Sequence, residues 1–154
     1  MSILHVTLAV FIVGPMAILP MTGMRAIRAG SGGAVAGLAR STLVFSLLSL
    51  LVVIFGFGLL GMADPKWGLS FTTPWILIST ILYVIALVLS LAVVVPALRG
   101  AAAGLKVGRA TGSNAEPAAS AAALPSSTYP RIAIGSGISA LLLVAVVVLM
   151  VWKP

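Results

Sequence analysis

The segment Thr42–Met62 reads TLVFSLLSLLVVIFGFGLLGM, which is 21 residues without a single charged side chain. A helix needs about 20 consecutive apolar residues to cross a hydrocarbon core of about 30 Å. Backbone N–H and C=O groups inside that core must find their partners within the segment, because no water is present there. This segment is therefore predicted to be a transmembrane helix.

Three further apolar runs resemble this segment in length and composition. They span Ile3–Met24, Trp75–Leu98 and Ile132–Trp152, and among them only His5 belongs to the Asp, Glu, Lys, Arg and His group. Charged residues make up 7% of the 154 positions, against about 25% in a soluble domain. The sequence predicts an all-α membrane protein, residues 1–154, built as a four-transmembrane-helix bundle in one membrane domain.

The basic residues predict how this bundle is oriented. Seven of the nine lie in the two connections on one side, namely Arg25, Arg28, Arg40, Arg99, Lys106, Arg109 and Arg131. Only Lys66 and Lys153 lie on the other side. Because cytoplasmic connections carry an excess of Lys and Arg, we expect both termini to be non-cytoplasmic. The chain is predicted to be multi-pass in the plasma (inner) membrane of a bacterium.

The same asymmetry explains the net charge of +7, so no nucleic-acid partner is predicted. Basic residues near a membrane surface attract anionic lipids with about 1 kcal/mol each. Membrane lipids are accordingly expected as partners, held at the ends of the apolar runs by Arg25, Arg28, Arg40 and Arg99.

The two connections on the basic side are predicted to be flexible. Residues 28–37 are rich in glycine, but no strand precedes them and no Gly-Lys-Ser/Thr follows. A flexible turn, with or without a short interfacial helix at its end, is therefore favoured over a nucleotide-binding loop. Residues 100–130 are rich in Ala, Ser, Gly and Pro, and the part 111–127 resembles a flexible linker.

Small and hydroxyl-bearing residues recur inside the runs at steps of three, four or seven, which places each set on one helix face. These residues are Thr42, Ser46, Ser49 and Gly56 in the second run, Ser79, Tyr83 and Ser90 in the third, and Ala133, Ser136, Gly137 and Ala140 in the fourth. In lipid, such faces let helices approach closely and form hydrogen bonds. Two interpretations stay open: packing within the chain, and binding of another integral membrane protein.

The first run contains Gly14-Pro15 near its middle. Proline removes one backbone hydrogen bond and clashes with the carbonyl group four residues earlier, so a kink is predicted. A kinked helix either adjusts the packing of its neighbours or shapes a cavity beside itself.

His5 is the strongest candidate ligand near a run. A lone imidazole does not make a zinc or copper site without other donors, and Met16, Met21 and Met24 lie roughly 16–28 Å further along the same helix. A heme needs only one axial ligand from His5 and a second donor from elsewhere. The two acids, Asp64 and Glu116, fall on opposite sides of the membrane. No enzyme and no bound metal are predicted, with heme at His5 as the open alternative.

The order of residues in and after the first run resembles a bacterial family. It consists of Leu4-His5, then Gly14-Pro15, Pro20, Arg25 and Arg28. The pattern is similar to uncharacterised small four-span integral membrane proteins, distantly related to the copper-resistance D membrane domain group, over roughly residues 3–100. Those families place a histidine at the start of the first span, as His5 is here. Their relatives that bind heme or copper have further histidines or intramembrane charged residues in later spans, which this chain lacks, so the resemblance does not by itself imply a ligand role for His5. The high content of Ala, Val and Gly resembles the composition of proteins from an actinobacterium.

Three functions fit these features. The favoured one is a non-catalytic accessory subunit that stabilises a larger hetero-oligomeric membrane complex, such as a lipid-import transporter or a respiratory assembly. The second is a heme- or copper-binding membrane protein that uses His5. The third is a carrier of a lipid or small molecule, bound in a groove beside the kinked first span.

Overall fold

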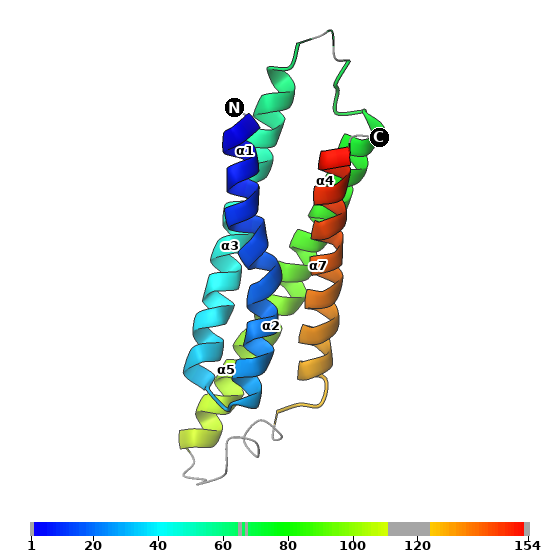
Figure 1. Cartoon of the computed structure of the whole chain (residues 1–154). Coiled ribbons are helices and arrows are strands. Elements are labelled where there is room, and N and C mark those ends of the chain that lie inside the picture. Colours follow the sequence, from blue (N-terminus) through cyan, green and yellow to red (C-terminus); the bar gives the residue numbers. More distant parts are fainter. Residues whose placement is uncertain (1, 65, 67, 111–123, 153–154) are drawn as a thin grey trace.

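The computed structural model of the protein describes residues 2–64, 66, 68–110 and 124–152. Within these residues the chain is helical and contains no strand (Figure 1). Four helical stretches are long and apolar enough to cross a membrane, and we number them as spans one to four: Ile3–Arg28, Gly32–Gly61, Pro74–Gly108 and Thr128–Trp152. The prediction of an all-α protein with four transmembrane helices is confirmed.

Two of the spans are continuous helices and two are interrupted by a π-helical turn. Span one comprises α1 (Ser2–Leu8), the π-helical turn η1 (Ala9–Val13) and α2 (Gly14–Arg28). Span two is α3 (Gly32–Gly61) and span four is α7 (Thr128–Trp152). Span three comprises α4 (Pro74–Leu89), the π-helical turn η3 (Ser90–Val94) and α5 (Val95–Ala110).

Both π-helical turns end two residues before a proline. η1 precedes Pro15, and η3 precedes Pro96. A proline in a regular α-helix lacks the N–H group that bonds four residues back, and its ring clashes with that carbonyl group. A π turn, which bonds five residues back, relieves this conflict, and in η3 the N–H group of Val95 donates to the carbonyl oxygen of Ser90. The predicted distortion at Pro15 therefore takes the form of a π turn.

The connections on the basic side are shorter than predicted. Spans one and two are joined by residues 29–31 alone, with Gly30 at a φ of 63°, a left-handed conformation that favours glycine. Residues 32–37, for which a flexible turn or a short interfacial helix was predicted, are helical and continue directly into span two. The prediction of a flexible connection is wrong for residues 100–110, which are also helical. The reason is burial, because these extensions of α3 and α5 pack against each other. The predicted linker at residues 111–123 lies outside the described residues.

The core of the bundle is concentrated in the half that holds α2, α3, α5 and the start of α7. Its buried apolar residues are Ile27, Val35, Ala39, Val94, Leu98, Ala101, Ala102, Leu105 and Ile132. A smaller cluster of Met16, Tyr83, Ala86 and Leu143 lies further along the bundle. Beyond it the spans form two pairs, with α1 and η1 on α3, and α4 on α7. Figure 1 shows these pairs diverging toward the end that carries both termini.

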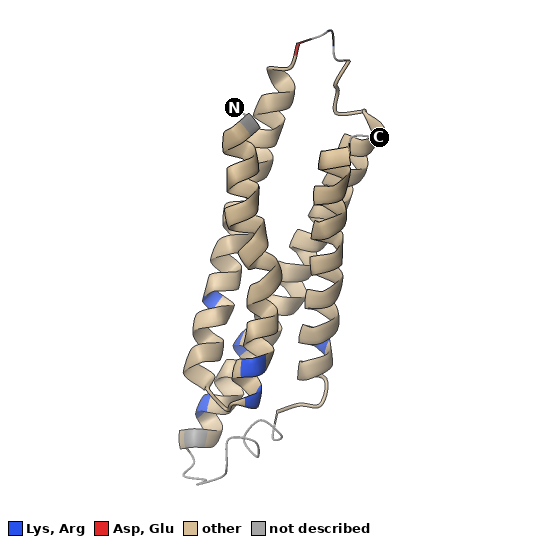
Figure 2. Ribbon diagram, viewed as in Figure 1, with Lys and Arg blue, Asp and Glu red and all other residues tan. Residues whose placement is uncertain are grey.

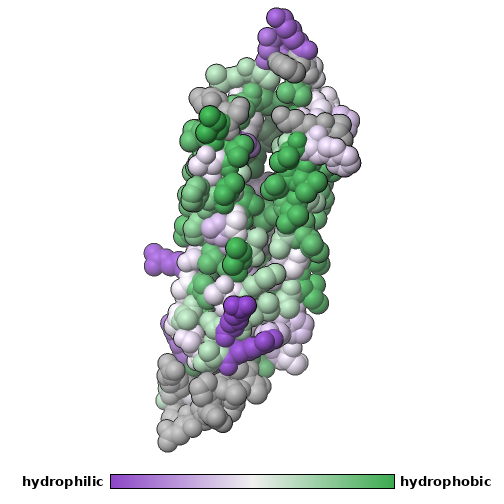
Figure 3. Space-filling view, viewed as in Figure 1, coloured by the Kyte–Doolittle hydropathy of each residue, from purple (hydrophilic) through white to green (hydrophobic). Residues whose placement is uncertain are grey.

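The two ends of the bundle differ in charge. The described Lys and Arg residues other than Lys66 lie in the half opposite the termini, as Figure 2 shows. We call this the basic end, and the end with Gly61, Pro74 and Trp152 the terminal end. Figure 3 shows apolar side chains over most of the visible surface between the two ends. The assignment of the basic end to the cytoplasm stays a prediction.

Candidate functional site

A set of hydroxyl groups joins spans two and three inside the bundle. The hydroxyl oxygens of Ser46 and Ser90 are 2.9 Å apart, and those of Ser49 and Tyr83 are 2.7 Å apart. Ser49 donates its single hydroxyl proton to the carbonyl oxygen of Ser46, 2.7 Å away, so Tyr83 is the donor to Ser49. These four side chains are buried. These two pairs of hydroxyl groups connect α3 to the α4–η3 segment by hydrogen bonds.

Other hydroxyls of the predicted faces bond to backbone carbonyl groups. Thr42 donates to the carbonyl oxygen of Leu38 at 2.8 Å, and Ser136 donates to that of Ala133 at 3.2 Å. Ser139, which the sequence did not single out, donates to the carbonyl oxygen of Ala86 on α4 at 3.4 Å. Most hydroxyl positions of the stripes thus face the inside of the bundle.

Five predicted positions differ from the rest. Ser79 is fully buried, yet its hydroxyl has no hydrogen-bond partner in the described part of the chain. Gly14 and Gly137 are partly exposed, and a Cβ atom at either would meet nothing within 4 Å. Ala133 and Ala140 are likewise only partly buried. Gly14 and Gly137 are therefore not closely packed within the described chain, and binding of another membrane protein at these positions stays a prediction.

His5 on α1 lies against Gly56 on α3. A Cβ atom at Gly56 would be 2.9 Å from Cε1 of the imidazole ring, which is closer than real Cβ contacts. The absence of a side chain at position 56 therefore makes room for the ring. Nδ1 of His5 is buried and has no hydrogen-bond partner among the described residues. The spacing of small residues located Gly56 on a packing face, but it did not reveal that the packed group is the only histidine.

His5 does not belong to a cluster of metal-binding side chains in the described part of the chain. No three His, Cys, Asp or Glu residues in the described ranges lie close enough to hold a metal ion. Met16 lies in the core beside Tyr83 and Ala86. Ser49, a possible nucleophile, is seven residues from Gly56 on α3, or roughly 10 Å along the helix. His5 is therefore not placed to act as its general base.

The arginines predicted to contact lipid are exposed at the basic end. Arg25, Arg28, Arg40 and Arg99 all have solvent-exposed side chains. The guanidinium carbon of Arg28 is 5.1 Å from the centre of the Tyr129 ring, within the range of a cation–π interaction. This contact links α2 to the start of α7. Tyr129 was not identified from the sequence, since nothing in its spacing relates it to Arg28.

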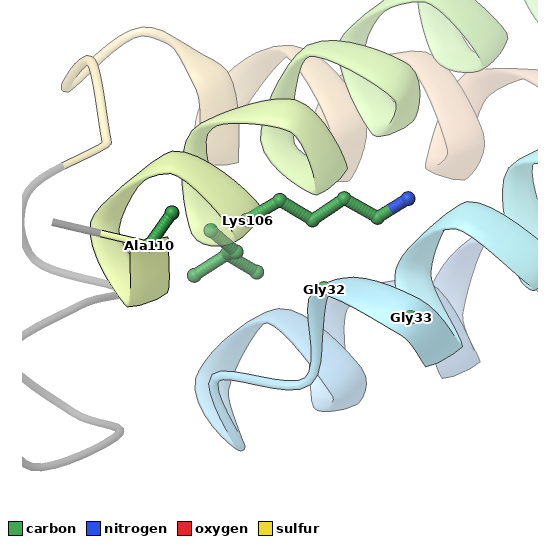
Figure 4. Close-up of a pocket in the computed structure, with 5 residues that line it drawn as sticks. Gly32, Gly33, Lys106 and Ala110 are labelled. Atoms are coloured by element: carbon green, nitrogen blue, oxygen red, sulfur yellow. The ribbon is translucent and has the colours of Figure 1, made fainter. Parts of the chain in front are cut away.

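Two pockets open on the surface of the basic end. The first, of about 290 Å³, lies between the start of α3 and the end of α5, where Lys106 extends beside Gly32 and Gly33 (Figure 4). The second, of about 300 Å³, lies between α4, η3 and α7. Neither is lined by residues of the kinked span one, where a cavity was the alternative to an adjustment of packing.

Four apolar helices, a neutral interior and basic residues gathered at one end define a multi-pass integral membrane protein. The sequence matches, over residues 1–154, a family described as predicted integral membrane protein (DUF2269), and the chain belongs to this family. No curated protein and no solved structure matches the chain.

Proposed function

We propose that the chain is a non-catalytic accessory subunit that stabilises a larger complex in the plasma membrane of a bacterium. In the described part of the chain, the buried hydroxyl groups form hydrogen bonds within the chain, except for that of Ser79. Catalysis needs a base and a nucleophile within reach of each other, or a bound metal ion. A structural role in contact with other integral membrane proteins fits such an interior better than a reaction does.

The observation that carries this proposal is the incomplete packing of the terminal end. On α3 the last buried side chain toward this end is Val52, and on α7 it is Leu143. α1 and η1 pack on α3, and no extensive interface joins them to α4 or α7 in the described residues. Large apolar side chains such as Phe11, which is 71% exposed, face outward there. This half of the bundle supplies surface that a neighbouring helix would cover.

Small residues on α3 indicate where a helix would approach. Gly58 and Gly61 are exposed at the terminal end, and a Cβ atom at either would meet nothing within 4 Å. Lipid tails are as apolar as leucine, so helices associate in membranes where small residues permit close backbone contact. We propose that a transmembrane helix of a different integral membrane protein occupies this face. A lipid-import transporter and a respiratory assembly are the two kinds of complex that we would test first.

The test uses a photo-crosslinking amino acid at position 58, with position 33 as the control. Gly33 is equally open and exposed, but it lies at the opposite end of the same helix. We expect position 58 to crosslink one defined membrane protein in native membranes, position 33 not to, and Gly61→Leu to weaken the crosslink. Adducts with lipid alone, or equal adducts at both positions, would overturn the proposal. Extraction of the chain from the membrane as a monodisperse protein without a bound partner would also overturn the proposal.

A second candidate function follows from the contact between His5 and Gly56. The half-buried imidazole, whose Nδ1 has no hydrogen-bond partner among the described residues, supports a heme-binding role in which His5 is one axial ligand. The second donor would come from a partner protein or a second copy. An absorption spectrum of the protein extracted from native membranes tests this idea. A Soret band that is lost in His5→Ala supports it, and a featureless spectrum contradicts it.

A further inference from the structure

The groove of about 300 Å³ between spans three and four combines an apolar trough with one cationic group. Leu89 and Val93 form one wall, Ile134 and Ile138 form the other, and Ser127 and Arg131 lie at the basic end. Ile134 is 61% exposed and Ile138 44% exposed. The groove therefore faces the lipid rather than another part of the described chain.

The order of these residues along α7 follows the order of chemical groups in a phospholipid. Arg131 precedes Ile138 by seven residues, or roughly 10 Å along the helix axis. A cation at the rim and a trough that extends from it into the apolar part of the bundle match a phosphate group and an acyl chain. Among the residues that the structure describes, no acidic side chain forms an ion pair with Arg131. Its charge is thus available to an anionic group at the membrane surface.

The floor of the groove is built by close packing rather than by loose side chains. Gly135 is buried, and a Cβ atom there would lie 3.2 Å from Cγ2 of Val94 and 3.3 Å from Cγ1 of Val93. The glycine lets α7 lie directly against η3, the π turn that precedes Pro96. Because both walls belong to helices in contact, the groove is formed before any ligand enters it.

We propose that this groove binds one anionic phospholipid of the surrounding bilayer. An acyl chain lies between the two apolar walls, and the phosphate group accepts hydrogen bonds from Arg131, with Ser127 as a second donor. The site is separate from the terminal end at which a partner helix is proposed, so either proposal can fail without the other. It is lined by residues of spans three and four and of the segment before α7, whereas the groove of the third candidate function was placed beside span one.

The experiment is native mass spectrometry of the purified full chain with phosphatidylglycerol or phosphatidylcholine of identical acyl chains. We expect one phosphatidylglycerol molecule to be retained preferentially. Arg131→Gln should reduce that preference about fivefold, which corresponds to the roughly 1 kcal/mol contributed by one basic residue near an anionic surface. Lys106→Gln removes the same charge at the same end of the bundle without touching the groove, and it should leave the preference unchanged.

A second variant tests the apolar trough independently of charge. Ile138→Trp fills the groove from an exposed position, so the fold should tolerate it, and we expect both lipids to be lost from the site. Equal effects of Arg131→Gln and Lys106→Gln would show only general attraction to anionic lipid and would overturn the proposal. Full lipid retention by Ile138→Trp would also overturn it. A photo-crosslinker at position 138 that captures a second copy of the chain in place of lipid would assign the groove to a dimer instead.

Discussion

The hydroxyl groups of Ser46 on α3 and Ser90 at the start of η3 lie 2.9 Å apart in the interior of the bundle. Ser90 is the first residue of the π turn that ends two residues before Pro96. Span three therefore departs from regular α-helical geometry at the same residue that forms a hydrogen bond with span two. No buried residue that the structure describes is charged, so this hydrogen bond helps to fix how the two helices pack against each other.

Replacing either partner of this bond should destabilise the bundle. We expect Ser46→Ala and Ser90→Ala each to lower the free energy of unfolding, because one buried hydroxyl is left without a partner. The coupling energy from the double variant should fall at about 0.6–1.7 kcal/mol, as for interhelical hydrogen bonds in membrane proteins. Unfolding titrations in mixed micelles measure these energies. Thr22→Ala, which removes an exposed hydroxyl, is the control and should change the free energy of unfolding little. Strictly additive losses in the Ser46 and Ser90 variants would show that the hydrogen bond contributes nothing.

Neighbouring glycines at the start of α3 should respond in opposite ways to the same substitution. A Cβ atom at Gly32 would lie 3.1 Å from Cβ of Leu105 and 3.2 Å from the carbonyl oxygen of Ala102, and neither atom moves easily. Overpacking of this kind costs about 1–3 kcal/mol, so Gly32→Ala should lower the thermal unfolding midpoint. Gly33 has open space around it, and Gly33→Ala should leave the midpoint unchanged or raise it. Circular dichroism in detergent measures both, and equal midpoints would contradict the close approach of α3 to α5.

The fold class could be predicted from the sequence because membrane burial is a property of composition and length. The residues at which the helices begin and end could not be predicted in this way. Residues 32–41 and 99–110 contain glycine and charge, and they are helical because Val35 and Leu105 are buried between α3 and α5, which no local pattern reveals. Spacing also assigns a residue to a helix face without naming what it meets there. Ser46 and Ser90 were both predicted to lie on packing faces, but their bond depends on how the two spans are aligned.

The π turn before Pro96 could not be predicted from the local sequence either. Pro15 was expected to distort span one because it lacks a backbone N–H group and lies near the middle of the run. Pro96 lies near the end of an apolar run, where a proline does not need to interrupt a span. Only the continuation of the helix through α5 to Ala110 makes Pro96 an interior residue and so requires an adjustment in the preceding turn.

The contact between His5 and Gly56 can be tested without any ligand. We expect Gly56→Ala to displace the imidazole ring, since the new Cβ atom would lie 2.9 Å from Cε1. The ring is at the end of a flexible side chain, so stability should change by less than about 1 kcal/mol. The chain has one histidine, and its imidazole nitrogen signals in an NMR spectrum can be assigned directly. Gly58→Ala, at an open position on the same helix, should leave those signals in place, and unchanged signals in both variants would show that the two residues are not in contact.

The predicted orientation of the bundle can be measured with single cysteines, because the natural chain contains none. Ala29 lies in the turn between α2 and α3 at the basic end, and Ser70 precedes α4 at the terminal end, with both side chains exposed. Since basic connections stay in the cytoplasm, a membrane-impermeant maleimide added to intact cells should label Ser70→Cys and not Ala29→Cys. Permeabilised cells should give labelling of both, which controls for the reactivity of each site. Labelling of Ala29→Cys alone in intact cells would reverse the topology, and it would place Arg131 and the proposed lipid groove in the outer leaflet.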